Sequence, residues 1–124
     1  MLQFPKISDS EWEVMKVLWL ASPRTANEVI EVLQDRKDWS PKTVRTLLNR
    51  LVEKSAVAYN QVQRVYSYYP LLKETECIQS ETQSFLSKIY GGALKPMLVN
   101  FLKDDKLSKE DLEELKGILE QRRD

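Results

Sequence analysis

The side chains best suited to binding chemistry in this sequence are cations, hydroxyls and an amide that lie close together between residues 40 and 50. They are Ser40, Lys42, Thr43, Arg45, Thr46, Asn49 and Arg50, and no acidic residue stands among them. Lysine and arginine neutralise phosphate, whereas Arg, Asn and Thr side chains match the hydrogen-bonding edges and methyl groups of DNA bases. The set therefore predicts a surface that contacts duplex DNA.

The members of this set have different expected roles. Ser40 and the start of a helix offer N–H groups and a partial positive charge to a phosphate, and Lys42 and Arg50 neutralise backbone charge. The groups expected to reach base edges are Thr43, Arg45, Thr46 and Asn49. Arg50 has Glu53 and Lys54 within one helical turn, so a structural role is the alternative for this residue.

Charge is unevenly distributed along the chain, although 19 basic and 19 acidic residues leave its formal net charge at zero. Between Arg36 and Arg64 there are seven basic and two acidic residues, whereas from Leu72 onward there are nine basic and eleven acidic ones. The first stretch suits an anionic partner. A basic face that is merely solvated is the alternative, and charge alone does not separate the two.

Three short helices are expected to position these residues. Two capping boxes mark the first two helix starts: Ser8 with Glu11, and Thr25 with Glu28. Ser40, followed by a proline at the first helical position, marks the third start. The third helix has an apolar stripe at helical spacing, and this stripe places the polar set on the opposite face. The stripe consists of Val44, Leu47, Leu48 and Leu51.

Residues 56–59 and 65–69 are rich in β-branched and aromatic side chains and predict the two strands of a β-hairpin. The polar residues 60–64 between them contain neither a glycine nor an Asn-Gly pair, so we expect a long and mobile loop rather than a tight turn. Arg64 lies near the tip of this hairpin, where it can reach a phosphate or the minor groove.

The last third of the chain is helix-forming. One helix starts near Lys73 and stops at Gly91-Gly92, a second covers residues 94–102, and Ser108 begins the last. Their apolar stripes exceed what one small domain can bury, which predicts a homodimer. The residues expected to form it are Phe85, Leu86, Ile89, Leu98, Phe101, Leu112, Leu115 and Leu119.

Three helices followed by a hairpin, with the third helix basic on its free face, is the order of elements in a winged helix-turn-helix module. The expected fold class is therefore mainly α with a small β-hairpin. We assign a winged helix-turn-helix DNA-binding domain to residues 1–71 and a helical dimerisation arm to residues 72–124. A two-fold dimer places its recognition helices about 34 Å apart, or a multiple of that distance, and selects a palindromic site.

The composition disfavours other function classes. The chain has no histidine, no glycine-rich phosphate loop and no cluster with metal-ligand spacing, so we expect no enzyme activity, metal or cofactor. Cys77, the single cysteine, is expected to be a small buried hydrophobe. No apolar run is long enough to span a membrane and no secretory signal is recognisable, so we expect a cytoplasmic protein.

Two other kinds of binding stay open from the residues alone. A helix-turn-helix fold can serve as a protein–protein interaction module that does not bind DNA in a sequence-specific way. Aromatic side chains can also stack on single-stranded bases, although helical spacing and strand alternation favour core packing for most of them. These aromatic residues are Trp12, Trp19, Trp39, Tyr66, Tyr68 and Tyr69, of which Trp39 also fits the position of a hydrophobic staple before Ser40.

Several separated blocks of the sequence, in order and at similar spacing, resemble the BlaI/MecI family of penicillinase and methicillin-resistance repressors. The blocks are SDSEWEVMKVLW, TANEVIEVL, DWSPKTVRTLLNRL, VYSYYP, FLSKIYGG and LVNFL. They span nearly the whole chain, and WSPKTVRTLLNRL is the most specific of them.

The resemblance implies a homodimer whose N-terminal winged-helix domains bind a palindromic operator of β-lactamase or resistance-type genes. It also implies inactivation by cleavage in the C-terminal part, triggered directly or indirectly by a membrane sensor of β-lactams. The cleavage position of the family falls on Asn100–Phe101. Its DNA-reading positions fall on Lys42, Thr43, Arg45 and Thr46, and Arg64 falls in the wing.

The chain departs from the family pattern in two respects. The copper-responsive relatives carry paired cysteines near the C-terminus, and these are absent here, which disfavours metal sensing. Ser55 stands where relatives commonly have glycine after the recognition helix. Glycine enters the left-handed region freely and serine does so at a cost, so the entry angle of the hairpin can differ from that of the family, whereas the fold is expected to be the same.

Overall fold

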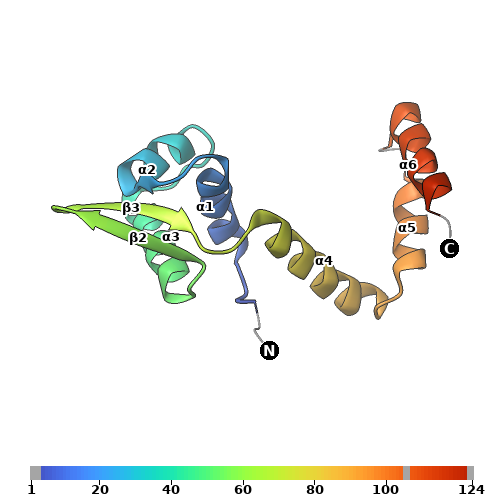
Figure 1. Cartoon of the computed structure of the whole chain (residues 1–124), viewed down its shortest axis with the longest axis horizontal. Coiled ribbons are helices and arrows are strands. Elements are labelled where there is room, and N and C mark those ends of the chain that lie inside the picture. The colour runs from blue at the N-terminus through green and yellow to red at the C-terminus, as the bar shows by residue number, and fades with distance from the viewer. Residues whose placement is uncertain (1–3, 105–106, 123–124) are drawn as a thin grey trace. The chain divides into compact units, whose positions relative to one another are not determined.

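The computed structural model describes residues 4–104 and 107–122, and it is mainly helical with a small antiparallel sheet (Figure 1). The predicted fold class, a winged helix-turn-helix domain with further helices, is confirmed. In chain order the elements are α1 (Asp9–Leu20), β1 (Arg24–Thr25), α2 (Ala26–Gln34), α3 (Pro41–Glu53), β2 (Val57–Val62), β3 (Val65–Pro70), α4 (Glu74–Tyr90), α5 (Leu94–Lys103) and α6 (Lys109–Gln121).

The predicted helix starts are confirmed by their hydrogen bonds. In the first capping box the Glu11 amide donates to Ser8 Oγ at 3.1 Å, and the Ser8 amide donates to Glu11 Oε1 at 2.9 Å. The second box, Thr25 with Glu28, has the same reciprocal pair. Ser40 caps α3 by accepting from a backbone amide one turn on. These bonds satisfy amides that a helix start leaves without an intrahelical partner.

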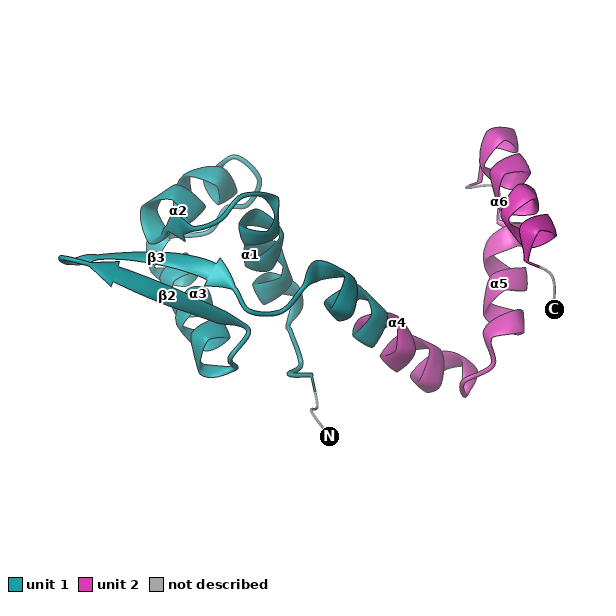
Figure 2. Cartoon of the chain, in the orientation of Figure 1, with its two compact units in different colours: residues 1–80 teal, residues 81–124 magenta. Residues whose placement is uncertain are grey.

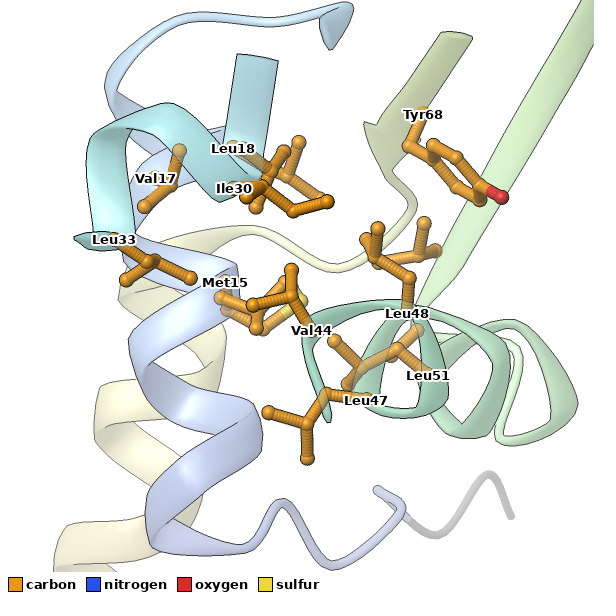
Figure 3. Packing of buried hydrophobic residues seen from close by; sticks show 14 of the residues in the cluster. Met15, Val17, Leu18, Ile30, Leu33, Val44, Leu47, Leu48, Leu51 and Tyr68 are labelled. Carbon is orange, nitrogen blue, oxygen red and sulfur yellow. The ribbon is translucent and has the colours of Figure 1, made fainter. Parts of the chain in front are cut away.

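The core lies where α1, α2 and α3 meet the sheet (Figure 3). The apolar stripe predicted for the third helix is buried in it with all four of its residues, beside apolar side chains of α1 and α2 such as Leu18 and Leu33. Tyr68 of β3 closes the core from the sheet side and is 8% exposed. Three more of the predicted aromatic residues, Trp12, Trp19 and Trp39, are partly buried and pack against this cluster.

The wing differs from the predicted long loop. β2 and β3 pair along their whole length, from Val57 opposite Pro70 to Val62 opposite Val65, so only Gln63 and Arg64 form the turn. Gln63 adopts a positive φ of 58°, which gives the tight turn without a glycine. The prediction of a mobile five-residue loop was therefore wrong, because polar residues can continue a strand when the opposite strand completes its hydrogen bonds.

A third strand was missed by the sequence analysis. β1 is only two residues long and pairs with β3, Arg24 opposite Tyr68 and Thr25 opposite Ser67, which gives the strand order β1-β3-β2. Two residues have no periodicity to detect. Their pairing joins the start of α2 to the wing.

The link from α3 to β2 passes through Ser55, which has a left-handed φ of 61°. The Ser55 amide donates to the Val52 carbonyl and the Ala56 amide donates to the Leu51 carbonyl, each at 3.0 Å. These two bonds form a Schellman motif, whose left-handed residue is usually glycine. Serine thus occupies a left-handed position that glycine usually fills, and it does so at a cost in backbone free energy.

The chain divides into two compact units, residues 1–80 and 81–124 (Figure 2). The division falls within α4, whose first turns belong to the first unit. There the Trp19 indole N–H donates to the Leu72 carbonyl at 2.9 Å, and Cys77 is buried with 3% exposure. Burial raises the pKa of the Cys77 thiol, in keeping with its predicted role as a small buried hydrophobe.

The second unit contains the end of α4 with α5 and α6. Gly91 and Gly92 end α4 with positive φ values of 60° and 87°, as predicted. Ser108 caps α6 in a capping box with Asp111. Among the described helices, none has the length and apolarity needed to cross a membrane.

Candidate nucleic-acid interface

α3 has two faces of opposite character. Its apolar stripe is almost completely buried, whereas the side chains predicted to contact DNA are all exposed. The exposed set on α3 and its N-cap is Ser40, Lys42, Thr43, Arg45, Thr46, Asn49 and Arg50. A single helix thus fixes these groups on one rigid scaffold, which is the geometry that groove recognition requires.

The hydroxyl groups of this face are engaged within α3. Ser40 Oγ accepts from the Thr43 amide at 3.2 Å and lies 3.0 Å from Thr43 Oγ1. Thr46 Oγ1 donates to the Lys42 carbonyl at 2.9 Å. Since these hydroxyls already have partners, the methyl groups of the two threonines remain for apolar contacts such as that with thymine.

Arg45 has a partner on another helix. Its Nη2 donates to Asn27 Oδ1 of α2 at 2.9 Å, and both residues are exposed. Sequence reasoning missed Asn27, because it lies 18 residues before Arg45 and shares no periodic pattern with it. Its position just inside a capped helix start was the only available signal.

An open depression of about 460 Å³ lies between α2, α3 and the wing. The wing contributes Gln61, Arg64 and Tyr66, and the helices contribute Asn27 and Arg45. The predicted wing contact and the predicted base-reading arginine therefore lie around one depression. Its lining presents cationic, amide and aromatic side chains, and such groups suit contact with a nucleic acid.

The wing carries an aromatic row on one face. The rings of Tyr59 and Tyr66 stack with centroids 4.6 Å apart, and the ring centroid of Tyr59 lies 5.8 Å from that of the buried Tyr68. The two stacked rings are exposed but cover each other, whereas Tyr68 belongs to the core. Most of the aromatic residues considered for base stacking thus have structural roles, as the spacing indicated.

One of the basic residues between Arg36 and Arg64 is neutralised within the fold and is not available to bind an anion. Lys54 forms an ion pair with the carboxylate of Glu11, which is only 2% exposed, and also donates to the Lys6 carbonyl at 2.7 Å. Burial alone raises the pKa of Glu11, but hydrogen bonds from Lys54 and the Ser8 amide outweigh it and hold the pKa below its usual value. Lys54 is therefore structural.

The other cations of the interface are not neutralised in this way. Within residues 4–104 and 107–122, the ion pairs are Lys54–Glu11 and Lys16–Glu13, and neither involves a predicted DNA contact. In particular, Arg50 forms no ion pair with the described acidic residues, although Glu53 is close in sequence. Four cations thus keep their charges available for an anion, namely Lys42, Arg45, Arg50 and Arg64.

The residues predicted for dimerisation lie on α4, α5 and α6, and most are exposed. Leu115 is 39% and Leu119 66% exposed, and Phe85, Ile89, Leu98, Phe101 and Leu112 fall between these values. Leu86 differs, because it is 7% exposed and thus buried within its own chain. Asn100 and Phe101, the predicted cleavage position, lie inside α5, where Asn100 Nδ2 donates to the Tyr90 hydroxyl at 3.2 Å.

The described part of the chain contains no group of His, Cys, Asp and Glu side chains that could hold a metal ion. The penicillinase repressor family model matches residues 7–121, which cover most of each unit.

This chain belongs to the penicillinase repressor family. The family consists of DNA-binding transcriptional repressors, and membership makes the chain a DNA-binding repressor rather than an enzyme. The resemblance inferred from the sequence blocks is confirmed.

Two curated relatives show how far the family similarity extends. The chain is 45% identical over 121 residues to a penicillinase repressor of Bacillus licheniformis, covering 98% of this chain and 94% of that protein. It is 38% identical over 114 residues to the methicillin resistance regulatory protein MecI of Staphylococcus aureus, covering 92% and 93%.

Solved structures of the repressor BlaI match part of this chain. The solution structure of the DNA-binding domain of the repressor BlaI is 45% identical, with a TM-score of 0.55, and the match covers 61% of this chain and 93% of that one. The monomeric form of Bacillus licheniformis BlaI in complex with the blaP half-operator matches with the same identity and coverage and a TM-score of 0.53.

Proposed function

We propose that this penicillinase repressor family member binds a palindromic operator as a homodimer and represses β-lactamase or resistance-type genes. The observation that carries the proposal is the exposed set on α3 from Lys42 to Arg50, which is cationic, contains no acidic residue and lies opposite a buried apolar stripe. It belongs to a chain 45% identical to a penicillinase repressor, and the BlaI relative has been solved with an operator half-site.

α3 enters the major groove in this proposal. Lys42 and Arg50 contact phosphates, Ser40 presents the helix start to the backbone, and Arg45, Asn49 and the two threonine methyl groups meet base edges. Arg64, at the turn of the wing, reaches the backbone or minor groove beside it. The wing needs no long loop to do this, since its two-residue turn places Arg64 at the tip.

The second unit supplies the dimer contact. Its exposed apolar side chains come from all three helices, Phe85 on α4, Leu98 on α5 and Leu115 on α6 among them. Burying such a surface against a second copy removes apolar area from water, at about 25 cal/mol per Å². A two-fold axis then repeats the α3 face about one or more DNA turns away, which accounts for a palindromic site.

Cleavage between Asn100 and Phe101 inactivates the repressor in this proposal, with a membrane β-lactam sensor acting directly or through an intermediary. The bond lies within α5, so the helix must open locally before a protease can act. α5 suits such opening, because its N-cap is Ala93 and provides no side-chain hydrogen bond. Loss of the C-terminal segment would remove α6 and with it part of the dimer surface.

The test is selection of duplexes from a random-sequence pool by the full-length protein, followed by gel shift of the selected operator. We expect a palindromic consensus and two protein chains per duplex by mass. A protein–protein module without sequence-specific DNA binding would enrich no consensus, and this result would overturn the proposal. Cleavage is tested separately, by identifying the new N-terminus of the fragment formed when a sensor-bearing host is exposed to a β-lactam.

A further inference from the structure

The bond from Arg45 Nη2 to Asn27 Oδ1 distinguishes Arg45 from the other side chains of the α3 face. The hydroxyl bonds of Thr43 and Thr46 stay within α3 and its N-cap. Arg45, by contrast, reaches to α2 and is held there at 2.9 Å. A long, flexible side chain is thus fixed at a specific place on the exposed surface.

Asn27 itself stands on a well-fixed backbone. It is the second residue of α2, directly inside the capping box in which the Thr25 amide donates to Glu28 at 2.8 Å and the Glu28 amide donates back at 3.2 Å. Thr25 is also paired with Ser67 of β3. The strand pairing of Thr25 and the capping box between Thr25 and Glu28 therefore fix the backbone on either side of Asn27 in the sequence.

The chemistry of this pair leaves Arg45 able to bind DNA. A guanidinium has five N–H donors and no acceptor, so one bond to an amide oxygen leaves enough donors for the two acceptors of a guanine. The Asn27 amide is also neutral and keeps the full charge of Arg45, whereas a carboxylate at this place would compensate it. Fixing the side chain in advance reduces the entropy lost when DNA binds.

We propose that Asn27 is a positioning residue that holds Arg45 in the orientation from which it reads a base. The inference rests on the proposed function, because it assigns to Asn27 a part in the specificity of the same α3 face. Asn27 acts through Arg45 and makes no base contact of its own. Its effect is therefore on discrimination between DNA sequences and not on general affinity for DNA.

The experiment compares full-length Asn27→Ala, Arg45→Ala and the double variant on the selected operator and on random duplex. Asn27→Ala should weaken operator binding about 3- to 10-fold by freeing the Arg45 side chain. It should leave random-duplex binding, the salt dependence and the thermal unfolding temperature unchanged. In the Arg45→Ala background the same change should have no further effect. Gln34→Ala, a neutral amide at the other end of α2, is the matched control and should bind like the parent.

Each outcome decides one point. If Asn27→Ala keeps full discrimination while Arg45→Ala loses it, the positioning role is overturned and the proposed function stands. If Asn27→Ala weakens binding equally in the parent and in Arg45→Ala, Asn27 contacts DNA itself and the inference is wrong. If none of the variants, including Arg45→Ala, alters discrimination, the base-reading function of the α3 face fails as well.

Discussion

Lys54, the C-cap residue of α3, forms an ion pair with the buried carboxylate of Glu11 in α1. Glu11 is at the same time the reciprocal partner of Ser8 in the capping box that starts α1. The pair therefore joins the end of α3 to the start of α1. A cation counted from sequence as part of the DNA-binding charge is instead part of the scaffold that holds α3.

Replacing Lys54 with methionine should lower the free energy of unfolding by about 2–3 kcal/mol, because it leaves the Glu11 carboxylate buried without its cation. Lys16 offers the matched control, since it pairs with Glu13 at 3.0 Å on the surface. Lys16→Met should cost no more than about 0.5 kcal/mol. Urea unfolding of both variants measures the difference, and equal losses would contradict the structural role of the buried pair.

Acidification should destabilise the first unit, because protonation of Glu11 removes the charge that pairs with Lys54. The pKa of this carboxyl is lowered in the fold from its usual value of 4.5, so its stabilisation is fully present above that value and is lost as the pH falls through the folded pKa. Glu11→Gln should be less stable at neutral pH but should lose less stability on acidification. Glu13 and Glu28 have lowered pKa values too, so some acid dependence should remain. An identical slope in the variant would contradict this assignment.

Ser55→Gly should raise the free energy of unfolding by about 0.5–1 kcal/mol, because glycine adopts the left-handed φ of the Schellman motif without strain. Ser10→Gly, inside α1, is the control and should not stabilise the protein. Chemical denaturation of the two variants gives the comparison. A loss of stability in Ser55→Gly would show that the serine side chain contributes more than its backbone strain costs.

Arg45→Ala and Lys42→Ala should weaken DNA binding in different ways. For Arg45→Ala we expect a loss of about 1–3 kcal/mol of specific affinity and a relaxed preference at one base position. Lys42→Ala should weaken binding to all duplexes alike and reduce the slope of the salt dependence by about 1. Titrations at several salt concentrations on operator variants separate the two, and an unchanged slope for Lys42→Ala would remove it from the phosphate contacts.

A fragment of residues 1–80 should fold as a monomer and bind the operator weakly, since it lacks the second unit. A fragment of residues 1–71 should be less stable, because it loses the Leu72 carbonyl that accepts from Trp19 and the buried Cys77. Analytical ultracentrifugation and thermal unfolding check both statements. Full operator affinity in the 1–80 fragment would argue against dimerisation through α4, α5 and α6.

Much of the fold was predictable because it depends on local chemistry. The capping boxes at Ser8 and Thr25, the N-cap at Ser40 and the apolar stripe of α3 each involve residues within one or two turns. The prediction failed at the wing, where residues 60–62 continue β2 instead of forming a loop. Their strand conformation comes from β3, which the local sequence of β2 does not reveal.

The amino-acid sequence by itself determined which residues of α3 face outward and which are buried, since helical periodicity alone divides the two faces. Only the tertiary structure decided which residues far apart in the sequence meet: Lys54 pairs with Glu11, Arg45 donates a hydrogen bond to Asn27, and β1, directly before α2, pairs with β3 of the wing. The physical reason is distance along the chain. Contacts between residues many positions apart form only when helices and strands pack, and no repeating pattern in the sequence encodes them.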